Sequence, residues 1–368
     1  MNVLMVTPHL PPHQAANALL PHLLAEGLRR RGHAARFLTF GPGPSRGDVA
    51  FVRRRARLRA TRVPQALEAA ETWWKGDALV RGADVVHVHS STWMNQMAAR
   101  LAAWRGRPYV LTHYGTEIWH HDGKDAAFRA LNRGASHVAF YSQALLARAQ
   151  ELSVPMRKGS VVYPPVADFF RPLPPAERER ARQPVAPGGG PFLLNVKRLH
   201  PLADQATLLE AFARVRDRRR DAVLAIAGAG EEEAGLRARA ARLGLGDSVR
   251  FLGLVPNEDV ARLVAAADLF VLSSVLEATP TVALEALACG TPVVSTDNPG
   301  GVELHGLFGD DVTLAPRRQP EALAAAALAF LDAPRRASAG TAARVAESFR
   351  LDGVVLRYLA LYEEAGAA

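Results

Sequence analysis

Two glutamates form the clearest chemical pattern in the chain: Glu277 and Glu285 stand eight positions apart, on either side of Pro280. A short apolar segment ending at Ser273 predicts a strand, which puts Glu277 just beyond the strand's carboxyl end. Pro280 suits the first turn of a helix, because its missing N–H is not needed there. Both carboxylates would then flank a helix N-terminus, whose free amides and dipole bind anions. Because carboxylates accept hydrogen bonds from sugar hydroxyls, the pattern predicts a site for a phosphate that carries hydroxyl-rich groups.

The same stretch also has a structural alternative. Glu277 would be a surface glutamate and Glu285 a solvated helix residue, since two glutamates at this spacing are a weak pattern by themselves. We expect Thr279 or Thr281 to cap the exposed amides and Gly290 to end the helix. The order of strand, loop, proline and helix favours the chemical interpretation.

A pair of cations follows another predicted strand, residues 192–196. Lys197 and Arg198 lie at the first strand-to-helix crossing of the second half of the chain, where they can neutralise a diphosphate. Two solvated surface cations are the alternative. The next crossing starts at Gly228 and lacks the third glycine of a dinucleotide fingerprint, because Glu233 stands there. We interpret it as a plain turn before an acidic helix start.

Histidines are the candidates in the first half. His113 follows a predicted strand, residues 108–112, and is placed to donate or accept one hydrogen bond over a reacting sugar. The alternative is a packed histidine whose ring is satisfied by the protein. His87 and His89 share one face of another strand, but the sequence offers no evident third ligand beside them. We therefore expect no metal site.

The composition is that of an ordinary globular protein. The chain has 368 residues, of which 49% are hydrophobic and 22% charged, which suggests two domains whose cores need no disulfide or metal. Its single cysteine, Cys289, lies in an apolar run and is interpreted as a small buried hydrophobe, which fits a reducing compartment. No segment has the length of a transmembrane helix, and the first residues predict a strand rather than a signal peptide. We therefore expect a cytoplasmic protein.

Positive charge is concentrated in arginine. The formal net charge is +9, but the sequence has no helix–turn–helix, zinc-finger or aromatic RNA-binding signature, so nucleic acid is not an expected partner. A cluster of arginines lies between Arg53 and Arg62. A solvated arginine face is the favoured interpretation. The alternative is peripheral contact with the anionic inner face of a membrane.

Strand and helix patterns alternate along both halves of the chain. The alternation predicts an α/β fold of two doubly wound, Rossmann-like parallel sheets that face a cleft, with ligands beyond the carboxyl ends of the strands. We expect one domain over residues 1–170 and another over residues 191–349. A stretch rich in proline and glycine, residues 171–190, predicts the linker between them, and residues 350–368 predict a final helix.

Four segments together resemble a known family. They are Glu277–Val294, Asn195–Leu199, Ile226–Gly230 and Val249–Gly253. The first resembles the E-x7-E signature of retaining glycosyltransferases of family 4, which have the GT-B fold, and the resemblance extends over nearly the whole chain. It implies transfer of a sugar from a UDP-, GDP- or ADP-sugar to a hydroxyl of a small-molecule, glycan or lipid acceptor. It also implies retention at the anomeric carbon, with no metal or other cofactor.

The resemblance implies a role for particular residues. Glu277 would contact the hydroxyls of the donor sugar, Glu285 the ribose, and Arg198, with Lys197 beside it, the diphosphate. His113 would serve the reacting centre, so that the catalytic set is His113, Glu277 and Arg198. Further donor contacts are implied for Gly253, Leu254, Ala278, Thr279, Pro280, Thr281 and Val282. The N-terminal domain would receive the last helix and bind the acceptor, through His13, Asn17, Tyr114 and Glu117.

The chain also departs from the family pattern. The family places a phosphate-binding lysine five residues after the arginine, where this chain has Ala203, and we hypothesise that Lys197 substitutes for it. The Glu-Gly pair of the family is here Glu277 followed by Ala278, which stiffens the loop. The histidine of a common His-Gly-Ser/Thr-Asp/Glu run stands one position early, at His113.

Two alternatives to a transferase stay open. One is a nucleotide-sugar epimerase of related fold, which would turn over the donor without any acceptor. The other is a non-catalytic or weakened nucleotide-sugar-binding homologue, for which the missing lysine at Ala203 is the reason. A dehydrogenase is disfavoured, because the turn at Gly228 lacks the third glycine.

Overall fold

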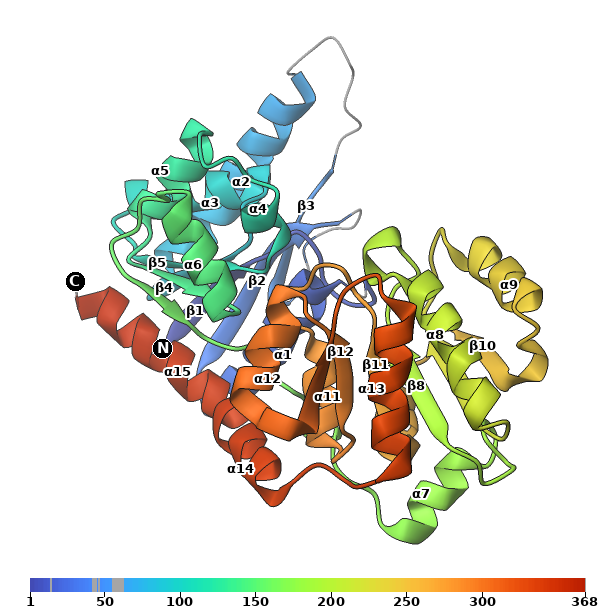
Figure 1. Cartoon of the computed structure of the whole chain (residues 1–368). Helices are drawn as coiled ribbons and strands as arrows, with labels where there is room; N and C mark the ends of the chain where they lie inside the picture. The colour runs from blue at the N-terminus through green and yellow to red at the C-terminus, as the bar shows by residue number, and fades with distance from the viewer. Residues whose placement is uncertain (14, 42–44, 46, 55–62, 368) are drawn as a thin grey trace. The chain divides into compact units, whose positions relative to one another are not determined.

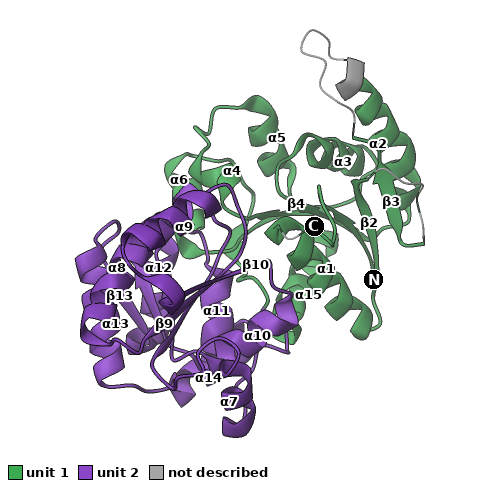
Figure 2. Cartoon of the chain, turned by 90° about the vertical axis from the view of Figure 1, so that its right-hand side faces the viewer, with its two compact units in different colours: residues 1–165, 351–368 green, residues 166–350 purple. Residues whose placement is uncertain are grey.

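The computed structural model describes residues 1–13, 15–41, 45, 47–54 and 63–367. It divides into two compact units: unit 1 is Met1–Pro165 with Leu351–Ala368, and unit 2 is Val166–Arg350. Figure 1 follows the elements along the chain, and Figure 2 colours the two units. Each unit is an α/β domain built on one parallel sheet, which confirms the predicted fold class.

Unit 1 has a seven-stranded sheet of order β3-β2-β1-β4-β5-β6-β7, in which every neighbouring pair is parallel. Its strands are β1 (Asn2–Val6), β2 (Ala34–Phe40), β3 (Val49–Val52), β4 (Val85–His89), β5 (Tyr109–His113), β6 (His137–Phe140) and β7 (Gly159–Val161). Its helices are α1 (Ala16–Arg30), α2 (Val63–Arg81), α3 (Trp93–Trp104), α4 (Thr116–Trp119), α5 (Ala126–Gly134), α6 (Gln143–Glu151) and α15 (Leu351–Ala367). The chain winds outward from β1 to β3 and then resumes at β4 on the other side of β1, which is a doubly wound arrangement.

Unit 2 has a six-stranded parallel sheet of order β10-β9-β8-β11-β12-β13. Its strands are β8 (Phe192–Val196), β9 (Val223–Ala227), β10 (Val249–Gly253), β11 (Leu269–Leu272), β12 (Val293–Thr296) and β13 (Val312–Ala315). Its helices are α7 (Pro175–Arg182), α8 (Gln205–Arg218), α9 (Glu233–Arg242), α10 (Asn257–Ala266), α11 (Thr281–Ala288), α12 (Pro299–Phe308), α13 (Pro320–Asp332) and α14 (Ala339–Ser348). The winding direction changes between β8 and β11, as it does between β1 and β4 in unit 1.

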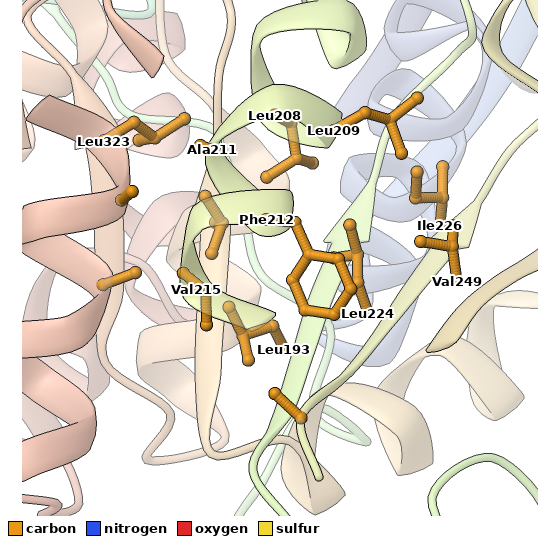
Figure 3. Packing of buried hydrophobic residues seen from close by; sticks show 14 of the residues in the cluster. Leu193, Leu208, Leu209, Ala211, Phe212, Val215, Leu224, Ile226, Val249 and Leu323 are labelled. Carbon is orange, nitrogen blue, oxygen red and sulfur yellow. The ribbon is translucent and has the colours of Figure 1, made fainter. Parts of the chain in front are cut away.

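Apolar residues at helical spacing bury one face of α8 against the sheet of unit 2. Leu208, Leu209, Phe212 and Val215 recur at positions i, i+1, i+4 and i+7, and each is at most 2% exposed. They share a cluster with Leu193 of β8 (Figure 3). Each large side chain buried in this way contributes about 1.5–3 kcal/mol. The packing sets the position of β8 and therefore of the loop that follows it.

The segment predicted as a linker, residues 171–190, is part of unit 2. It contains α7, from which Arg178 and Arg182 bond to the carboxylate of Asp268 at 2.5 and 2.8 Å, just before β11. The proline and glycine content is that of a linker, but these ion pairs tie the helix to the sheet. The chain passes between the units at Pro165 and Arg350 instead.

The last helix, α15, belongs to unit 1 although it follows unit 2 in the sequence. Its buried residues Val355 and Tyr358 share a hydrophobic cluster with Leu24 of α1 and with the sheet. Gly27 of α1 permits the close approach, because a Cβ there would lie 2.4 Å from Cγ2 of Val355. The helix therefore completes the core of unit 1.

A buried polar network joins α15 to the centre of the unit 1 sheet. The His87 ring contacts the Tyr362 hydroxyl through Nδ1 at 2.6 Å and the Thr112 hydroxyl through Nε2 at 2.7 Å. The Thr112 hydroxyl lies 3.1 Å from that of Tyr358. Burial lowers the pKa of His87, and it lowers the pKa of the adjacent His89 to about 3. Both histidines are therefore neutral packing groups at neutral pH.

Two findings bear on membranes. None of the described helices is long and apolar enough to cross a bilayer. Arg53 and Arg54 are exposed after β3, whereas the rest of the arginine cluster, from residue 55 to Arg62, lies outside the described residues.

Acid should weaken unit 1 through its buried histidines. A histidine whose pKa is lowered from 6.5 to about 3 in the folded state binds fewer protons there than in the unfolded chain. The free energy of unfolding therefore keeps the full contribution of the neutral histidine above pH 6.5 and loses it as the pH falls from 6.5 toward 3. We expect His89→Gln to reduce the loss of unfolding free energy between pH 7 and pH 5 by up to about 2 kcal/mol, measured by urea unfolding at each pH.

The matched control is His120→Gln, because His120 is exposed. An identical pH dependence in His89→Gln and the native protein would contradict the role given to His89.

Candidate functional site

Lys197 and Glu277 meet across the point where the strand order of unit 2 reverses. Lys197 follows β8 and Glu277 lies in the loop after β11, and these strands are neighbours in the sheet. In open parallel sheets, ligands bind in the crevice at such a point, beyond the carboxyl ends of the strands. The Lys197 ammonium Nζ lies 2.6 Å from Oε1 of Glu277, whose side chain is 10% exposed. The structure thus brings together one of the two predicted cations and the first predicted glutamate.

The N-terminus of α11 lies directly after Glu277 in the chain. The helix begins at Thr281, and Pro280 is the N-cap residue rather than part of the first turn. The prediction that Thr279 or Thr281 caps this end stays a prediction, and the N-cap residue Pro280 itself makes no side-chain cap bond. The reason is that proline takes the cap position and has no side-chain acceptor. The first amides of α11, which include those of Thr281 and Val282, are thereby left for an anion.

Glu285 lies in the second turn of α11. Burial raises the pKa of its carboxyl to about 7. The group therefore exchanges its proton near neutral pH, either accepting hydrogen bonds as a carboxylate or donating one as an acid. The solvated helix glutamate of the structural alternative would not show this shift.

The glycine turn after β9 holds the loop that carries Lys197. A Cβ on Gly228 would lie 2.0 Å from the Lys197 carbonyl oxygen, and one on Gly230 would lie 2.1 Å from that of Leu199. The Gly228 amide also donates to the Gly253 carbonyl at 2.7 Å. The turn thus binds two loops together through the backbone, which is a packing role that the sequence interpretation as a plain turn did not anticipate.

The start of α12 supports the Glu277 loop from the other side. The Gly300 amide donates to the Glu277 carbonyl at 3.1 Å, and a Cβ on Gly300 would lie 2.9 Å from the Ala278 carbonyl oxygen. Asn298 caps α12 by accepting from the Gly301 amide, and it donates to the Ser274 carbonyl at 3.2 Å. Sequence reasoning missed these residues. The sequence did contain a signal for this helix start, because an asparagine, a proline and two glycines follow a predicted strand, and asparagine and proline are common where a helix begins.

Arg198 points to another partner. Its side chain is 71% exposed and lies 3.2 Å from Glu231, at the turn before α9. The neighbouring position that lacks the family lysine, Ala203, is buried, and its carbonyl accepts from the Ser273 hydroxyl. Leu254, predicted near the donor, is exposed after β10. Arg198 therefore does not share the Glu277 contact that Lys197 makes.

His113 is fully buried at the end of β5 in unit 1. Its Nε2 lies 2.8 Å from the Asn132 side-chain oxygen, and its Nδ1 lies 3.5 Å from Oε1 of Glu117. The ring packs against Phe128 and Phe140. The packing is that of the structural alternative, but the ring is not fully satisfied, because Nδ1 is buried without a hydrogen-bond partner among the described residues. The role of His113 at a reacting centre stays a prediction.

The predicted acceptor residues lie in the loops and first helical turns that follow two strands of the unit 1 sheet. His13 and Asn17 follow β1, and Tyr114 and Glu117 follow β5, with β4 between those strands. The side-chain Oδ1 of Asn17 is buried and has no hydrogen-bond partner among the described residues. The Glu117 carboxylate accepts from the Tyr114 amide at 2.9 Å, and the Tyr114 hydroxyl lies 2.9 Å from Nδ1 of His89. Asn17 therefore offers an open acceptor within this set.

Comparison with known proteins gives the family. The model described as glycosyl transferases group 1 matches residues 177–346, and the glycosyl transferase 4-like domain matches residues 21–165. A D-inositol 3-phosphate glycosyltransferase of Thermobispora bispora is 31% identical over 309 residues, which are 77% of this chain and 71% of that protein. The chain belongs to the family 4-like glycosyltransferases.

Other relatives of this glycosyltransferase match it over a smaller share of their own length. D-inositol 3-phosphate glycosyltransferase 2 of Catenulispora acidiphila is 37% identical over 179 residues, which are 46% of this chain. The chain spans less than half of that relative, 41% of its length. Among solved structures, HepE of Anabaena in complex with UDP and glucose matches with a TM-score of 0.80 at 20% identity, over 99% of each chain. That likeness shows the fold, which is GT-B.

The two ion pairs on the β8 loop should differ in strength. We expect a double-mutant cycle of Lys197→Met and Glu277→Gln to give a coupling energy of about 1–2 kcal/mol in urea unfolding, because Glu277 is largely shielded from water. The matched cycle, Arg198→Met with Glu231→Gln, should give a coupling energy too small to measure, because both side chains are exposed. Equal coupling energies in the two cycles would show that the contact at Glu277 is no stronger than a surface pair.

Proposed function

We propose that this glycosyltransferase moves a sugar from a nucleotide-diphosphate sugar to an acceptor hydroxyl, with retention at the anomeric carbon and without a metal ion. The observation that carries the proposal is the contact of Lys197 with Glu277, at 2.6 Å, beside the uncapped N-terminus of α11. A sugar diphosphate needs cations and amides for its phosphates and acceptors for its hydroxyls, and all three are present at this crevice.

Lys197 takes the part that the family gives to a lysine at the position of Ala203. Its ammonium neutralises Glu277 while the crevice holds no donor, and it exchanges that partner for a phosphate oxygen when a donor binds. Glu277 is then released to accept hydrogen bonds from the sugar. One such charge-assisted contact to a developing diphosphate contributes about 2–4 kcal/mol to the transition state.

Departure of the nucleoside diphosphate is the step that the protein assists. Negative charge develops on the phosphate next to the breaking bond, and Lys197 and the first amides of α11 stabilise it. Arg198 contributes after turning away from Glu231, to which it is held only by an exposed contact. Glu285 binds the ribose hydroxyls. Retention follows when the acceptor oxygen attacks the face that the diphosphate leaves and passes its proton to that diphosphate.

The names of relatives suggest which substrates to test first. The Thermobispora relative is named for D-inositol 3-phosphate, and HepE was solved with UDP and glucose. We propose a UDP- or GDP-linked hexose as the donor and a polyol or its phosphate as the acceptor. In unit 1, the open Oδ1 of Asn17 is the group that would accept from an acceptor hydroxyl.

We also propose that the protein lies in the cytoplasm and makes peripheral contact with a membrane. Leu67 and Trp74 of α2 are exposed, and this helix follows the arginine cluster between Arg53 and Arg62. Exposed aromatic and basic side chains close together in the sequence suit an anionic membrane interface.

Nucleotide binding should identify the donor class and test Lys197. We expect one of UDP, GDP and ADP to raise the melting temperature of the full chain more than the others, since a ligand that binds only the folded state stabilises it. Lys197→Met should weaken that nucleotide by about tenfold or more, because a charge-assisted contact is lost. Arg262→Met is the matched control, since Arg262 is exposed on α10 and bonds to Asp259. Unchanged affinity in Lys197→Met would reject the substitution for the missing lysine.

Glu277→Gln should abolish most sugar transfer while nucleoside diphosphate binding is kept. The amide keeps the shape of the side chain but removes the charge that strong hydrogen bonds from sugar hydroxyls require, so a loss of about 100-fold in turnover is expected. Glu303→Gln, on the neighbouring α12, is the control. Full transfer by Glu277→Gln would overturn the assignment, and loss of activity in EDTA that added metal restores would overturn the metal-free mechanism.

The same assay separates the alternatives. Conversion of the donor sugar without any acceptor would identify an epimerase. Tight donor binding with no turnover across small-molecule, glycan and lipid acceptors would identify a binding homologue.

A further inference from the structure

A cavity of about 790 Å³ lies in unit 2 at the edge of the sheet opposite to Glu277. It adjoins Asp268 at the amino end of β11 and is bounded by α7, the C-terminal end of α11 and the first turns of α14. Its volume falls within the range of small-molecule sites, about 300–1,000 Å³. Because the donor crevice lies beyond the carboxyl ends of the same strands, this cavity is a separate place in the unit.

The lining of the cavity has an excess of positive charge. Its charged members are Arg178, Arg182, Arg336, Arg350, Asp268 and Glu179. Four guanidinium groups therefore face two carboxylates, which leaves two positive charges without a protein counter-charge in the lining. Leu173, Leu287 and Val345 supply an apolar wall beside them.

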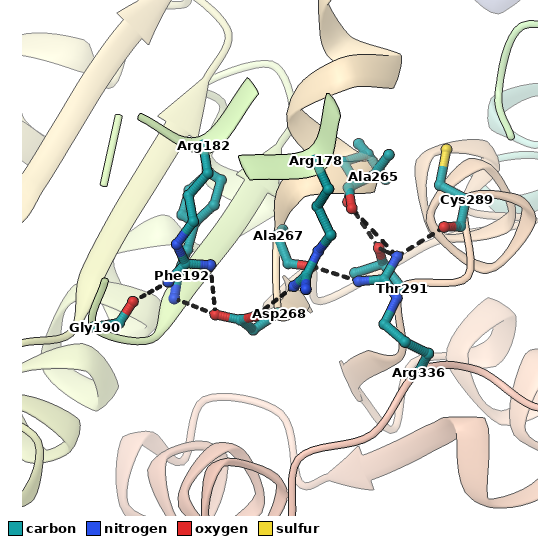
Figure 4. A network of polar contacts seen from close by, with 11 residues as sticks. Arg178, Arg182, Gly190, Phe192, Ala265, Ala267, Asp268, Cys289, Thr291 and Arg336 are labelled. Carbon is teal, nitrogen blue, oxygen red and sulfur yellow. Dashed lines mark hydrogen bonds and ion pairs between the residues drawn. The ribbon is translucent and has the colours of Figure 1, made fainter. Parts of the chain in front are cut away.

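The arginines compete for few acceptors (Figure 4). Arg178 and Arg182 share the Asp268 carboxylate, at 2.5 and 2.8 Å. Among the described residues, Arg336 bonds only to neutral oxygens, which include the carbonyls of Ala267 at 2.8 Å and Cys289 at 2.8 Å. Arg178 donates to the same Ala267 carbonyl at 3.4 Å, so two guanidinium groups meet at one oxygen. Burial and the charge of Arg178 lower the pKa of Arg336 to about 10.

One donor in this cluster has no acceptor. The Nε of Arg178 is buried and lacks a hydrogen-bond partner among the described residues. A purely structural cluster, which holds α7 and α14 to the sheet, explains the bonds of Arg182 and Arg336 but leaves this N–H unsatisfied. An anion placed beside Arg178 and Arg336 would reduce the repulsion between the two guanidinium groups. The start of α14, where Ala339 lines the cavity, is already capped by Ser338 and bound by the Asp311 carboxylate, so the arginines are the groups that would hold the anion.

We propose that this cavity is a second anion site, which binds the phosphate group of a small phosphorylated organic molecule. The guanidinium groups hold the phosphate, and the apolar wall contacts the organic body. Inorganic phosphate shares the recognised group but lacks the body, so the two sources differ in affinity.

Isothermal titration calorimetry of the full chain tests the site, with inorganic phosphate and glucose 6-phosphate as probes and sodium chloride to hold the ionic strength constant. We expect saturable binding of both, with glucose 6-phosphate the tighter. Arg178→Gln should weaken both by about tenfold or more, because one charge-assisted contact and one charge are lost. Arg182 keeps Asp268 paired in this variant.

A second variant guards against misfolding. Ala339→Glu places a carboxylate in the exposed first turn of α14, where it suits the helix dipole and maintains stability. Its charge repels an anion, so binding should weaken as it does in Arg178→Gln. Arg262→Gln, on the exposed face of α10, should bind both probes as the native protein does, and Arg198→Gln reports any binding in the donor crevice.

Hydrogen exchange gives the location independently, since bound probe should protect amides at the start of α14 and along α7. Unchanged affinity in both Arg178→Gln and Ala339→Glu would overturn the proposal. Loss of binding in Arg198→Gln alone would place the phosphate in the donor crevice and also overturn it. Absence of saturable binding would show that the arginines are structural only.

Discussion

The pairing of β8 with β11 is the contact on which the candidate site depends. Leu193 pairs with Leu269 and Leu194 with Phe270, and all four residues are buried. The chain reaches β11 only after passing through β9 and β10 on the other side of β8. The loops after β8 and β11 therefore leave toward opposite faces of the sheet and open a crevice between them. Lys197 and Glu277, far apart in the sequence, meet because of this strand order.

Close backbone packing holds both loops of the crevice in place. Gly228 and Gly230 pack against the carbonyls of the Lys197 loop, and Gly300 packs against the loop of Glu277. A side chain at any of these positions would displace a loop. The displacement would break the contact between Lys197 and Glu277, whose charged atoms lie 2.6 Å apart. The helix that follows Glu277 is left uncapped. Rigid loops around an unsatisfied helix end are what a site needs if it is to bind a charged ligand without reorganising.

Unit 1 uses its polar residues differently. The His87 network with Thr112, Tyr358 and Tyr362 fastens α15 to the sheet. His113 is also buried in the core of unit 1, where its ring contacts the side chain of Asn132. In the sequence these residues are candidates for catalytic or binding roles, because histidine and tyrosine carry functional groups. In a sheet covered on both faces, such groups must instead find partners inside the protein.

Periodicity and the segment from Glu277 to Val294 are local signals, so the amino-acid sequence predicted the alternation of strands and helices, the strand ends that carry the candidate residues, and the family. It also placed Glu277, Glu285 and Lys197 at the same edge of one sheet. The ion-pair partners follow from the folded arrangement of distant segments: Lys197 with Glu277, Arg198 with Glu231, and α7 with Asp268. The burial of His113 in unit 1 and the arginine-lined cavity at the amino ends of the unit 2 strands likewise follow from the folded structure. The physical reason is that periodicity reports which face of an element is buried, whereas ion pairs between distant segments depend on strand order and loop direction, which no local pattern encodes.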